Sequence, residues 1–510
     1  MALGQDRPAV REWSWVLPLG IAAVAFAARL LSALHSGGLA AIFGYDEGVY
    51  FAASTSWVSG LQPYRDFVLV HPPGSVVFLS PFALLGKATS EPTGWMIARL
   101  AVMALGALNA ALIFLIARRV NLVAGLVAGG LYAVWGPLIH VERTTMLEVF
   151  VLSGIVVALW ALDQPRVSTA RLLLAGAMLG LGMSTKLWGA VPLAVIVGWL
   201  LISRAWRSAA IVAGTALVAF AVVVLPFLLR APEQMFDLVV LGQIGRGRGG
   251  THTDDRLVQM FGLGLDKFIR DPRYGITIGL AALVLALVAM GIAWAVVPRA
   301  RVWVALLVVQ LAVLLVVPVY FEGYSSFIGP ALMLVVGSAV GIVWVGVGSR
   351  PHGTAVAIRT VLAVCVVAAA MTTGYRALRA PVDLKPKVVT VAEATNNAQC
   401  VGSDSAGVLL LANVLSRNID RGCPTVIDFD GLIYTFDDGN NPNRLSSTKR
   451  RRASAAYQQA MRDYFAANDV LLIHRPTADA FDQQTRKYLH SRPLLSKQHG
   501  LRAFGPATGG

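Results

Sequence analysis

Long apolar runs separated by short polar loops dominate the first three quarters of the chain. Runs of roughly 18 or more apolar residues recur between Trp15 and Thr372, and each is long enough to cross a hydrocarbon core about 30 Å thick. We therefore predict eleven membrane-spanning helices. They lie at about 15–34, 95–117, 122–139, 146–162, 172–183, 188–202 and 209–229, then as segments ending before 299, near 319 and before 350, and at about 355–372.

One apolar run differs from the others in length. Residues 75–85 are apolar but too few to span a bilayer, and they follow Pro72 and Pro73. We expect this segment to form a helix that lies in the membrane interface.

The hydropathy falls after about residue 374, which divides the chain into two predicted domains. Residues 1–374 form the membrane domain, with an outer loop at 35–94, and residues 375–510 form a soluble domain. Strand-like runs occur at 408–411, 425–429 and 470–474, and a helix-like stretch at about 453–467. This pattern favours a small α/β fold. The predicted fold class is therefore a polytopic α-helical membrane protein with a C-terminal α/β domain.

Composition and charge support the membrane assignment and set an orientation. The chain is 56% hydrophobic and 14% charged, with a net charge of +15. Arginines in short loops fall on one side if there are eleven spans, so the N-terminus is predicted to be cytoplasmic and the C-terminal domain extracytoplasmic, in the plasma membrane. These arginines are 7, 11, 118, 119, 166, 171, 204, 207, 299, 301, 350 and 359. We expect no nucleic-acid partner, and we interpret the first run as a retained span.

Acidic residues collect in the loops predicted to face outward. Asp46 and Glu47 are adjacent, just past the first span. The others are Asp66, Glu91, Glu142, Glu148, Glu233, Asp237, Asp254, Asp255 and Glu322. We expect the chemistry to take place on the outer side.

Two cysteines lie in the predicted extracytoplasmic domain. An oxidising compartment makes a disulfide between Cys400 and Cys423 plausible, and it would contribute about 3 kcal/mol. The alternative is two free buried thiols. Cys365 lies in the last span, where we expect it to be packed. The basic run at 449–452 is most simply a solvated loop.

Four motifs, in order along the chain, resemble those of GT-C membrane glycosyltransferases. Asp46-Glu47, then Pro63-Tyr64-Arg65-Asp66-Phe67 and His71-Pro72-Pro73, resemble the first outer loop of this superfamily. The most similar group includes the protein O-mannosyltransferases and lipid A aminoarabinose transferases. Three later segments are similar as well: 143–150, an arginine followed by an acid; 180–186, a glycine-rich span ending in Thr-Lys; and 324–330, a tyrosine-and-proline segment.

The sequence also departs from the pattern of that group. Trp188 interrupts the small residues that usually follow Thr-Lys. The segment at Tyr324 lacks a doubled tyrosine and has Gly329 before Pro330.

The resemblance implies an inverting transfer of a sugar from a polyprenyl monophosphate to a hydroxyl on the outer face of the membrane. Asp46 aligns with the catalytic acid and would act as the base, while Glu47 would orient the acceptor or share that role. Adjacent carboxylates raise each other's proton affinity. Glu148 is a further candidate acid, with Glu142 as its competitor; an ion pair with Arg143 is the structural alternative.

Basic and aromatic residues are candidates for holding the donor phosphate and the acceptor. For the phosphate we name Lys186, Arg246, Tyr324 and Arg143, with Arg248 as an equal alternative to Arg246. A lysine at a membrane edge also reaches lipid head groups without any function. For the acceptor loop we name Tyr45, Arg65, Asp66 and His71. His71 fits a turn with its two prolines better than a metal site.

No spacing of His, Cys and acidic residues indicates a metal, and the resemblance implies no catalytic metal. We expect no cofactor, and a divalent cation stays an open alternative. The expected partners are a polyprenyl-phosphate sugar, the membrane, and a lipid, glycan or protein acceptor. High alanine, valine, glycine and arginine usage is typical of GC-rich bacteria, in which mannose or arabinose would be a reasonable sugar for the cell envelope.

Two other functions fit a chain of this kind. A transporter or flippase for lipid-linked sugars would show internal repeats and acids near the middle of spans, and neither is evident. A non-catalytic scaffold of the same fold that binds cell-wall glycan would keep its function when Asp46 is replaced.

Overall fold

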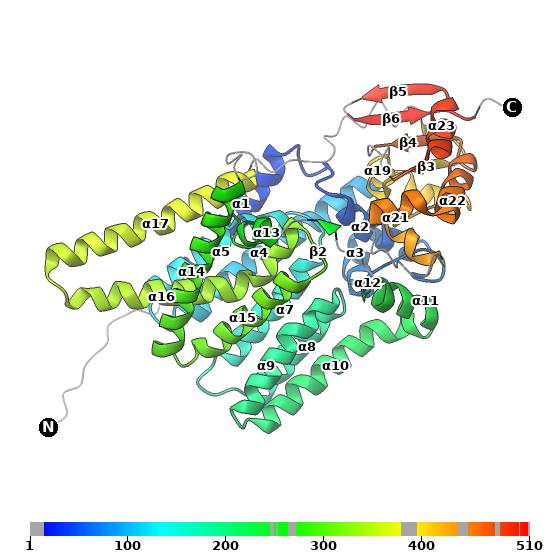
Figure 1. Ribbon diagram of the computed structural model, residues 1–510. Coiled ribbons are helices and arrows are strands. Elements are labelled where there is room, and N and C mark those ends of the chain that lie inside the picture. The colour runs from blue at the N-terminus through cyan, green and yellow to red at the C-terminus, as the bar shows by residue number, and fades with distance from the viewer. Residues whose placement is uncertain are drawn as a thin grey trace.

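The computed structural model describes residues 15–244, 249–250, 253–263, 272–378, 395–436, 447–474, 480–498 and 500–507. A large group of apolar helices makes up most of the molecule, and a smaller region of helices and short strands packs against one end of it (Figure 1).

Every predicted span coincides with at least one apolar helix. The helices are α1 (Val16–His35), α4 (Glu91–Ala117), α5 (Leu122–Val134), α6 (Gly136–Glu142), α7 (Glu148–Leu162), α8 (Thr169–Met183), α9 (Ala190–Ile202), α10 (Trp206–Leu228), α14 (Pro272–Val296), α15 (Ala300–Val316), α16 (Gly329–Gly346) and α17 (His352–Leu378). In the described part of the chain, six helices are long and apolar enough to cross a membrane alone, at 16–35, 91–117, 206–228, 275–296, 322–349 and 352–378. The prediction of a polytopic helical membrane protein is confirmed.

The predicted third span is a broken helix. It consists of α5 and α6, which meet at an angle of 55° and count as a seventh span if they cross together. Trp135 at the junction has extended backbone, and Pro137 lies in the first turn of α6. A proline lacks the N–H that donates within a helix and is favoured in the first turn, so Pro137 suits a helix that restarts here.

The outer loop between the first and second spans contains two helices. They are α2 (Tyr45–Val58) and α3 (Gly74–Ala88), and α3 covers the apolar run predicted to lie in the interface. The first residue of α3 touches the end of α8: the Gly74 N–H donates to the Ser184 carbonyl at 2.8 Å. A Cβ at Gly74 would meet Ser184 Oγ at 2.4 Å, so only glycine fits this contact.

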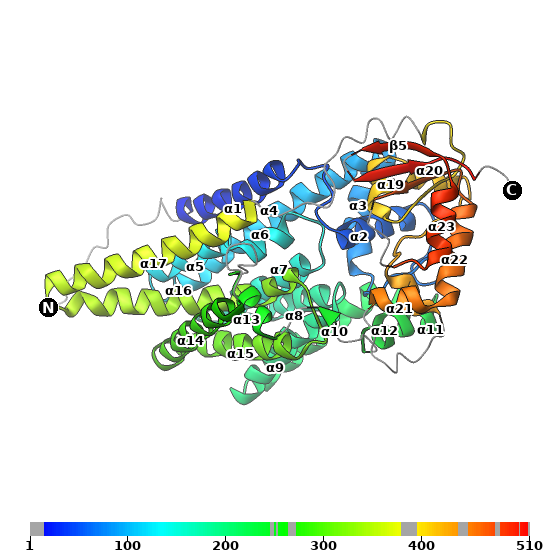
Figure 2. The same ribbon diagram turned by 45° about the horizontal axis from the view of Figure 1, so that its top comes forward.

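The C-terminal region contains one four-stranded sheet with helices around it (Figure 2). The strands are β3 (Val401–Ser403), β4 (Val470–Ile473), β5 (Leu494–Gln498) and β6 (Leu501–Phe504), in the order β3-β4-β6-β5. β3 and β4 are parallel, and the other pairs are antiparallel. The helices are α19 (Ala406–Leu411), α20 (Leu415–Asp420), α21 (Ser447–Ala453), α22 (Ala455–Ala466) and α23 (Gln483–Ser491).

Some of the predicted elements of this region were wrong. The strand at 470–474 and the helix at 453–467 are confirmed by β4 and α22. The run 408–411 is instead part of the buried helix α19, and 425–429 is irregular. Short apolar runs that are buried on all sides carry no periodicity, so they do not distinguish a strand from a helix.

The three cysteines also have defined places. Cys400 and Cys423 form a disulfide, with an S–S distance of 2.02 Å and Cα atoms 5.6 Å apart. Cys365 is exposed on α17, so the expectation that it is packed in the interior was wrong.

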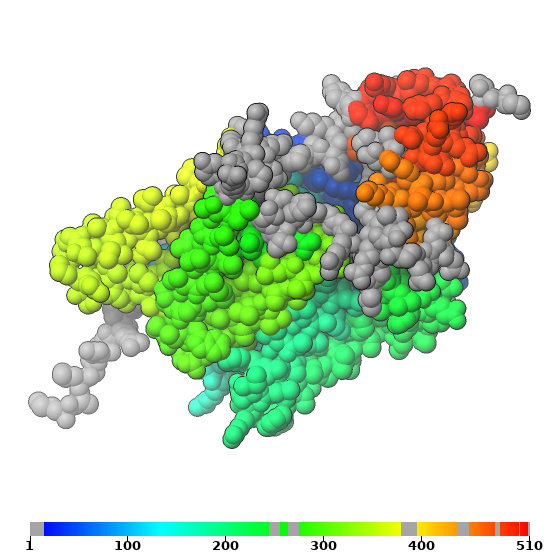
Figure 3. All heavy atoms as spheres, in the orientation of Figure 1, coloured from blue at the N-terminus to red at the C-terminus, as the bar shows by residue number. Residues whose placement is uncertain are grey.

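The C-terminal region packs closely against α2 and α4. Figure 3 shows the orange and red surface of this region at one end of the molecule. Gly48 of α2 faces Gly407 of α19, and a Cβ added to Gly48 would lie 2.8 Å from the Gly407 Cα. The carboxylate of Glu91, at the start of α4, accepts hydrogen bonds from the backbone N–H groups of Leu415 and Ser416 in α20. The C-terminal region is therefore joined to the membrane helices by specific, buried contacts.

Candidate active site

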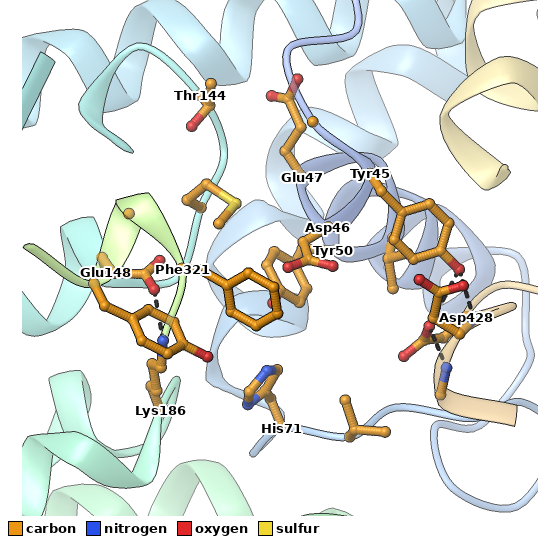
Figure 4. Close-up of a pocket in the computed structure, with 18 of the residues that line it drawn as sticks. Tyr45, Asp46, Glu47, Tyr50, His71, Thr144, Glu148, Lys186, Phe321 and Asp428 are labelled. Carbon is orange, nitrogen blue, oxygen red and sulfur yellow. Dashed lines mark hydrogen bonds and ion pairs between the residues drawn. The ribbon is translucent and has the colours of Figure 1, made fainter. Parts of the chain in front are cut away.

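A cavity of about 560 Å³ lies between the start of α2, the ends of the membrane helices and the C-terminal region (Figure 4). Its lining combines acids, one lysine and several aromatic rings from segments far apart in the sequence. The lining residues are 43–47, 49, 50, 70, 71, 140, 144, 146, 148, 186, 319, 321–324, 428, 430, 431, 434 and 448.

Asp46 occupies the middle of this cavity. It lies in the first turn of α2, after Gly44 as the N-cap residue, and its side chain is exposed to the cavity. Figure 4 shows its carboxylate between Glu148 and Lys186 on one side and Asp428 on the other. Asp46 is thus placed to accept a proton from a molecule bound in the cavity.

Lys186 and Glu148 form an ion pair in the cavity wall. The Lys186 Nζ lies 2.5 Å from Glu148 Oε1, and both residues are nearly buried. Glu148 begins α7, and Lys186 follows the turn at the end of α8. Glu148 Oε2 is buried without a hydrogen-bond partner among the described residues. The pair brings a cation and an acid, both predicted from the sequence, to the same place.

Aromatic rings surround this ammonium group. Its Nζ lies 4.2 Å from the ring centroid of Tyr324 and 4.6 Å from that of Trp188. The two rings are themselves in edge contact, with centroids 4.5 Å apart. A cation held over two ring faces gains electrostatic stabilisation. Trp188, which departs from the expected small residues, therefore forms part of the lysine's surroundings.

Tyr45 links the first outer loop to the C-terminal region. Its hydroxyl donates to Asp428 Oδ1 at 3.2 Å and accepts from the Asp430 N–H at 3.0 Å. Asp428 Oδ1 also accepts from the Gly431 N–H at 2.8 Å. Burial, with the nearby carboxylates of Asp430 and Asp46, raises the pKa of Asp428 to about 7.

Glu47 points away from the cavity centre and into the core. Its two carboxylate oxygens accept from Arg99, at 2.7 Å for Oε1 and 3.2 Å for Oε2, and Oε1 also accepts from the Phe43 N–H. Glu47 and Arg99 are both fully buried. The sequence predicted that Glu47 shares the base role or orients the acceptor, but its two oxygens are already engaged by the protein.

Glu142 and Glu148, the two alternative candidate acids, lie in different surroundings. Glu142 is fully buried and binds Arg29, with the Tyr132 hydroxyl donating to its Oε1 at 2.8 Å. Glu148 lines the cavity. Neither acid pairs with Arg143, which was the structural alternative.

Arg143 is not at the cavity surface. It is fully buried, donates through Nη1 to the hydroxyls of Ser32 and Ser36, and lies 4.6 Å over the ring of Phe43. It does not line the cavity, so a direct contact with a donor phosphate is not supported.

The predicted acceptor-loop residues separate into two sets. Tyr45 and His71 line the cavity. Arg65 and Asp66 do not: they pair with each other at 2.8 Å on the surface, where Asp66 also accepts from the Gln62 N–H. This pairing lowers the pKa of Asp66 and closes a turn, which is a structural role.

Arg246 and Arg248 lie outside the described residues, as does part of their loop. Within the described ranges, no group of three or more His, Cys, Asp or Glu side chains is arranged to hold a metal ion.

No sequence motif predicts two residues of the cavity wall. Asp428 and Tyr434 come from the C-terminal region, in a segment that was predicted in part as a strand and carries no recognisable motif. Only the packing of this region against α2 brings them to the site.

Comparison with known proteins supports a specific fold. The model of glycosyltransferase family 87 matches residues 69–318. The structure is similar to that of ArnT from Cupriavidus metallidurans bound to undecaprenyl phosphate, with a TM-score of 0.57 and 17% identity over 97% of this chain and 98% of that chain. The apo state of the same protein gives a TM-score of 0.59 at 16% identity, over 96% and 97% of the two chains.

A more distant likeness extends to archaea. AglB, the oligosaccharyltransferase of Archaeoglobus fulgidus in complex with an inhibitory peptide and a dolichol-phosphate, matches with a TM-score of 0.56 and 12% identity, over 91% of this chain and 69% of that chain. A search of curated proteins found no match. At these identities the likenesses establish the fold.

Proposed function

We propose that this chain, whose fold is similar to that of the membrane glycosyltransferases compared above, moves a sugar from a polyprenyl monophosphate to an acceptor hydroxyl, as a member of the GT-C superfamily would. The observation that carries the proposal is that Asp46 and Lys186 line the same cavity. One is a carboxylate suited to remove a proton, and the other is a cation suited to stabilise a phosphate.

The two sides of the cavity have different roles in the proposed reaction. Asp46 accepts the proton of the acceptor hydroxyl as its oxygen forms a bond to the anomeric carbon. The bond between that carbon and the phosphate oxygen breaks at the same time, and the polyprenyl phosphate leaves with the electron pair. Attack opposite the leaving group inverts the anomeric configuration.

Lys186 is the group we assign to the leaving phosphate. An ammonium group in a cavity of low dielectric constant stabilises developing negative charge far better than it does in water. Glu148 holds the ammonium group by the 2.5 Å contact, and Tyr324 lies beside it. The ArnT structure holds undecaprenyl phosphate, which supports a donor of this lipid class here.

Other parts of the proposal rest on the sequence. We place the cavity on the extracytoplasmic side of the plasma membrane because the arginine-rich loops fall on the other side. The donor sugar is mannose or arabinose in this proposal. Residues 375–510 are proposed as the extracytoplasmic domain and 1–374 as the membrane domain.

The test is transfer from radiolabelled polyprenyl-phosphate mannose and polyprenyl-phosphate arabinose, in membranes that carry the wild-type protein, Asp46→Asn or Asp66→Asn. We expect labelled product with the wild type and Asp66→Asn and a loss of at least a hundredfold with Asp46→Asn, in line with the usual worth of a general base. Asp66 is a matched control because it is an acid of the same loop outside the cavity. Equal transfer by Asp46→Asn would contradict the proposal.

A further inference from the structure

One wall of the cavity is supplied by the C-terminal region. Asp428, Asp430, Gly431, Tyr434 and Thr448 line it. Figure 4 shows Asp428 across Asp46 from Glu148 and Lys186. The proposed base thus separates a cationic end of the cavity from an end built by the C-terminal region.

The geometry of an inverting displacement indicates what binds at the end of the cavity built by the C-terminal region. The acceptor oxygen must approach the anomeric carbon from the side opposite the leaving phosphate. If the phosphate lies at Lys186, the body of the acceptor extends past Asp46 toward Asp428. The wall of the C-terminal region is therefore where the acceptor would rest.

Asp428 has an unused oxygen at this wall. Only 6% of the residue is exposed, and its Oδ1 accepts from the Tyr45 hydroxyl and the Gly431 N–H. In the part of the chain that the structure describes, Oδ2 accepts no hydrogen bond. Oδ2 is not one of the buried unpaired oxygens of the described residues, so it is accessible at the cavity wall, where a ligand hydroxyl can donate to it.

The charges at this wall select against an anionic ligand. Asp430 is paired with Arg451 at 2.7 Å, and neither Arg450 nor Arg451 lines the cavity. The carboxylates of Asp46 and Asp428 do line it, and they oppose an anionic ligand because like charges in contact are costly. A neutral ligand rich in hydroxyl groups avoids that penalty, and a cationic ligand is tested below with a lysine-rich peptide.

We propose that this wall is an acceptor-binding subsite and that the acceptor is a neutral glycan, one hydroxyl of which donates to Asp428 Oδ2. The inference rests on the proposed function, because it takes Lys186 as the phosphate end. A hydroxyl donating to a carboxylate forms a strong, charge-assisted hydrogen bond. Tyr45 and the Gly431 N–H fix the other oxygen, so Oδ2 is held in one direction.

The protonation of this carboxyl group adds support. Its pKa of about 7 means that it exists in both forms near neutral pH. The neutral form can donate to a sugar oxygen, and the ionised form can accept from a sugar hydroxyl. A polyol presents both kinds of partner.

The experiment measures binding without transfer. The full-length protein in lipid nanodiscs is titrated by calorimetry with octyl α-mannoside, octyl α-arabinofuranoside, a neutral peptide containing serine and threonine, and a lysine-rich peptide. The variants are Asp428→Ala, Asp428→Asn and, as a matched control, Asp463→Asn. Asp463 is an exposed acid on α22 that bonds to Gln459 and does not line the cavity.

We expect at least one octyl glycoside to bind the wild type and Asp463→Asn equally, and Asp428→Ala to bind it at least tenfold more weakly. Asp428→Asn keeps an oxygen for Tyr45 and Gly431, so it shows the effect with the local fold preserved. Glycoside affinity unchanged in both Asp428 variants, no glycoside binding by the wild type, or preferred binding of either peptide would overturn the inference.

The experiments distinguish a failure of the proposed transferase function from a failure of the subsite proposal. If the wild type binds a glycoside through Asp428 but transfers no sugar from either labelled donor, the transferase proposal is wrong and the glycan subsite stands. If it transfers sugar but Asp428→Ala leaves the acceptor KM unchanged, the subsite is wrong and the transferase proposal stands.

Discussion

The ammonium group of Lys186 lies 2.5 Å from Glu148 Oε1, and neither side chain is more than 7% exposed. The two charges neutralise each other in a site that is poorly solvated. A buried pair of this kind adds little net stability, but removal of one partner strands the other charge. The pair therefore makes the cation available to a phosphate at a low cost to the fold.

A double substitution separates the two roles of this pair. Lys186→Met leaves Glu148 uncompensated, so we expect a loss of roughly 3 kcal/mol in unfolding free energy, whereas the double variant Lys186→Met, Glu148→Gln should recover most of it. Neither variant should regain transfer, since both lack the cation, and we expect a loss of at least a hundredfold in kcat/KM. Thermal unfolding in detergent and donor kinetics measure the two effects. Full activity of the stable double variant would rule out a role for Lys186.

Glu47 is expected to matter for folding rather than for the chemistry. Glu47→Gln removes the charge that faces the buried Arg99, which should lower the unfolding free energy by roughly 3 kcal/mol. Transfer per folded molecule should stay within tenfold of the wild type, because the side chain of Glu47 is engaged in the core. The measurement combines thermal unfolding with activity normalised to folded protein. Normal stability with lost activity would instead indicate that Glu47 takes part in catalysis.

Because of Asp428, we predict that the stability of the folded protein depends on pH. Its folded-state pKa of about 7 is above the unfolded value, so the folded state binds more protons between about pH 4 and 7, and stability falls as pH rises through that window. Asp428→Asn removes the buried charge and should make the protein more stable than the wild type at pH 8, by up to roughly 4 kcal/mol.

At pH 4 the two proteins should be nearly equal, because both then carry a neutral side chain at this position. Melting temperatures at pH 4, 6 and 8 test the sign, with Asp463→Asn as the control. A variant that is less stable than the wild type at pH 8 would show that burial does not penalise the charge. A variant that is more stable but binds acceptor poorly would be expected of a residue retained for function.

The docking of the C-terminal region on α2 should be sensitive to one methyl group. Gly48→Ala would place a Cβ 2.8 Å from the Gly407 Cα. Because the contacted atom belongs to the backbone, α2 and α19 must move apart, at a cost of roughly 1–3 kcal/mol. We expect faster proteolysis of the C-terminal region and reduced transfer.

Gly44→Ala is the matched control for this change. It lies in the turn before α2, where an added Cβ has nothing within 4 Å and the backbone is extended. It should leave proteolysis unaltered, and proteolysis alone is the readout for this control because Gly44 lines the cavity. If Gly48→Ala behaves in the same way, the close contact with α19 is not needed for assembly.

The membrane helices could be predicted because each depends on a local property, the length of an apolar run. The break between α5 and α6 was missed, although Pro137 marks it, because hydropathy alone joins the two segments. In the C-terminal region, the apolar residues of α19 were mistaken for a strand because they are buried on every side.

The site was predictable only where chemistry and local sequence coincide. Asp46, Glu148, Lys186 and Tyr324 lie in motifs and reach the same cavity. Glu47 follows Asp46 directly, and consecutive side chains on a helix point about 100° apart, so one enters the cavity and the other the core. Asp428 depends on packing between regions far apart in the sequence, which no local pattern reports.

The bond between Tyr45 and Asp428 has a consequence for the order of synthesis. A ribosome makes the residue beside the proposed base early, and makes its hydrogen-bond partner only after the whole membrane domain. A chain that stops after α17 would carry all its membrane helices but not the wall that closes the cavity. The site would thus become complete only after residues 428–448 have been made, and chains that stop before them would lack this wall of the cavity.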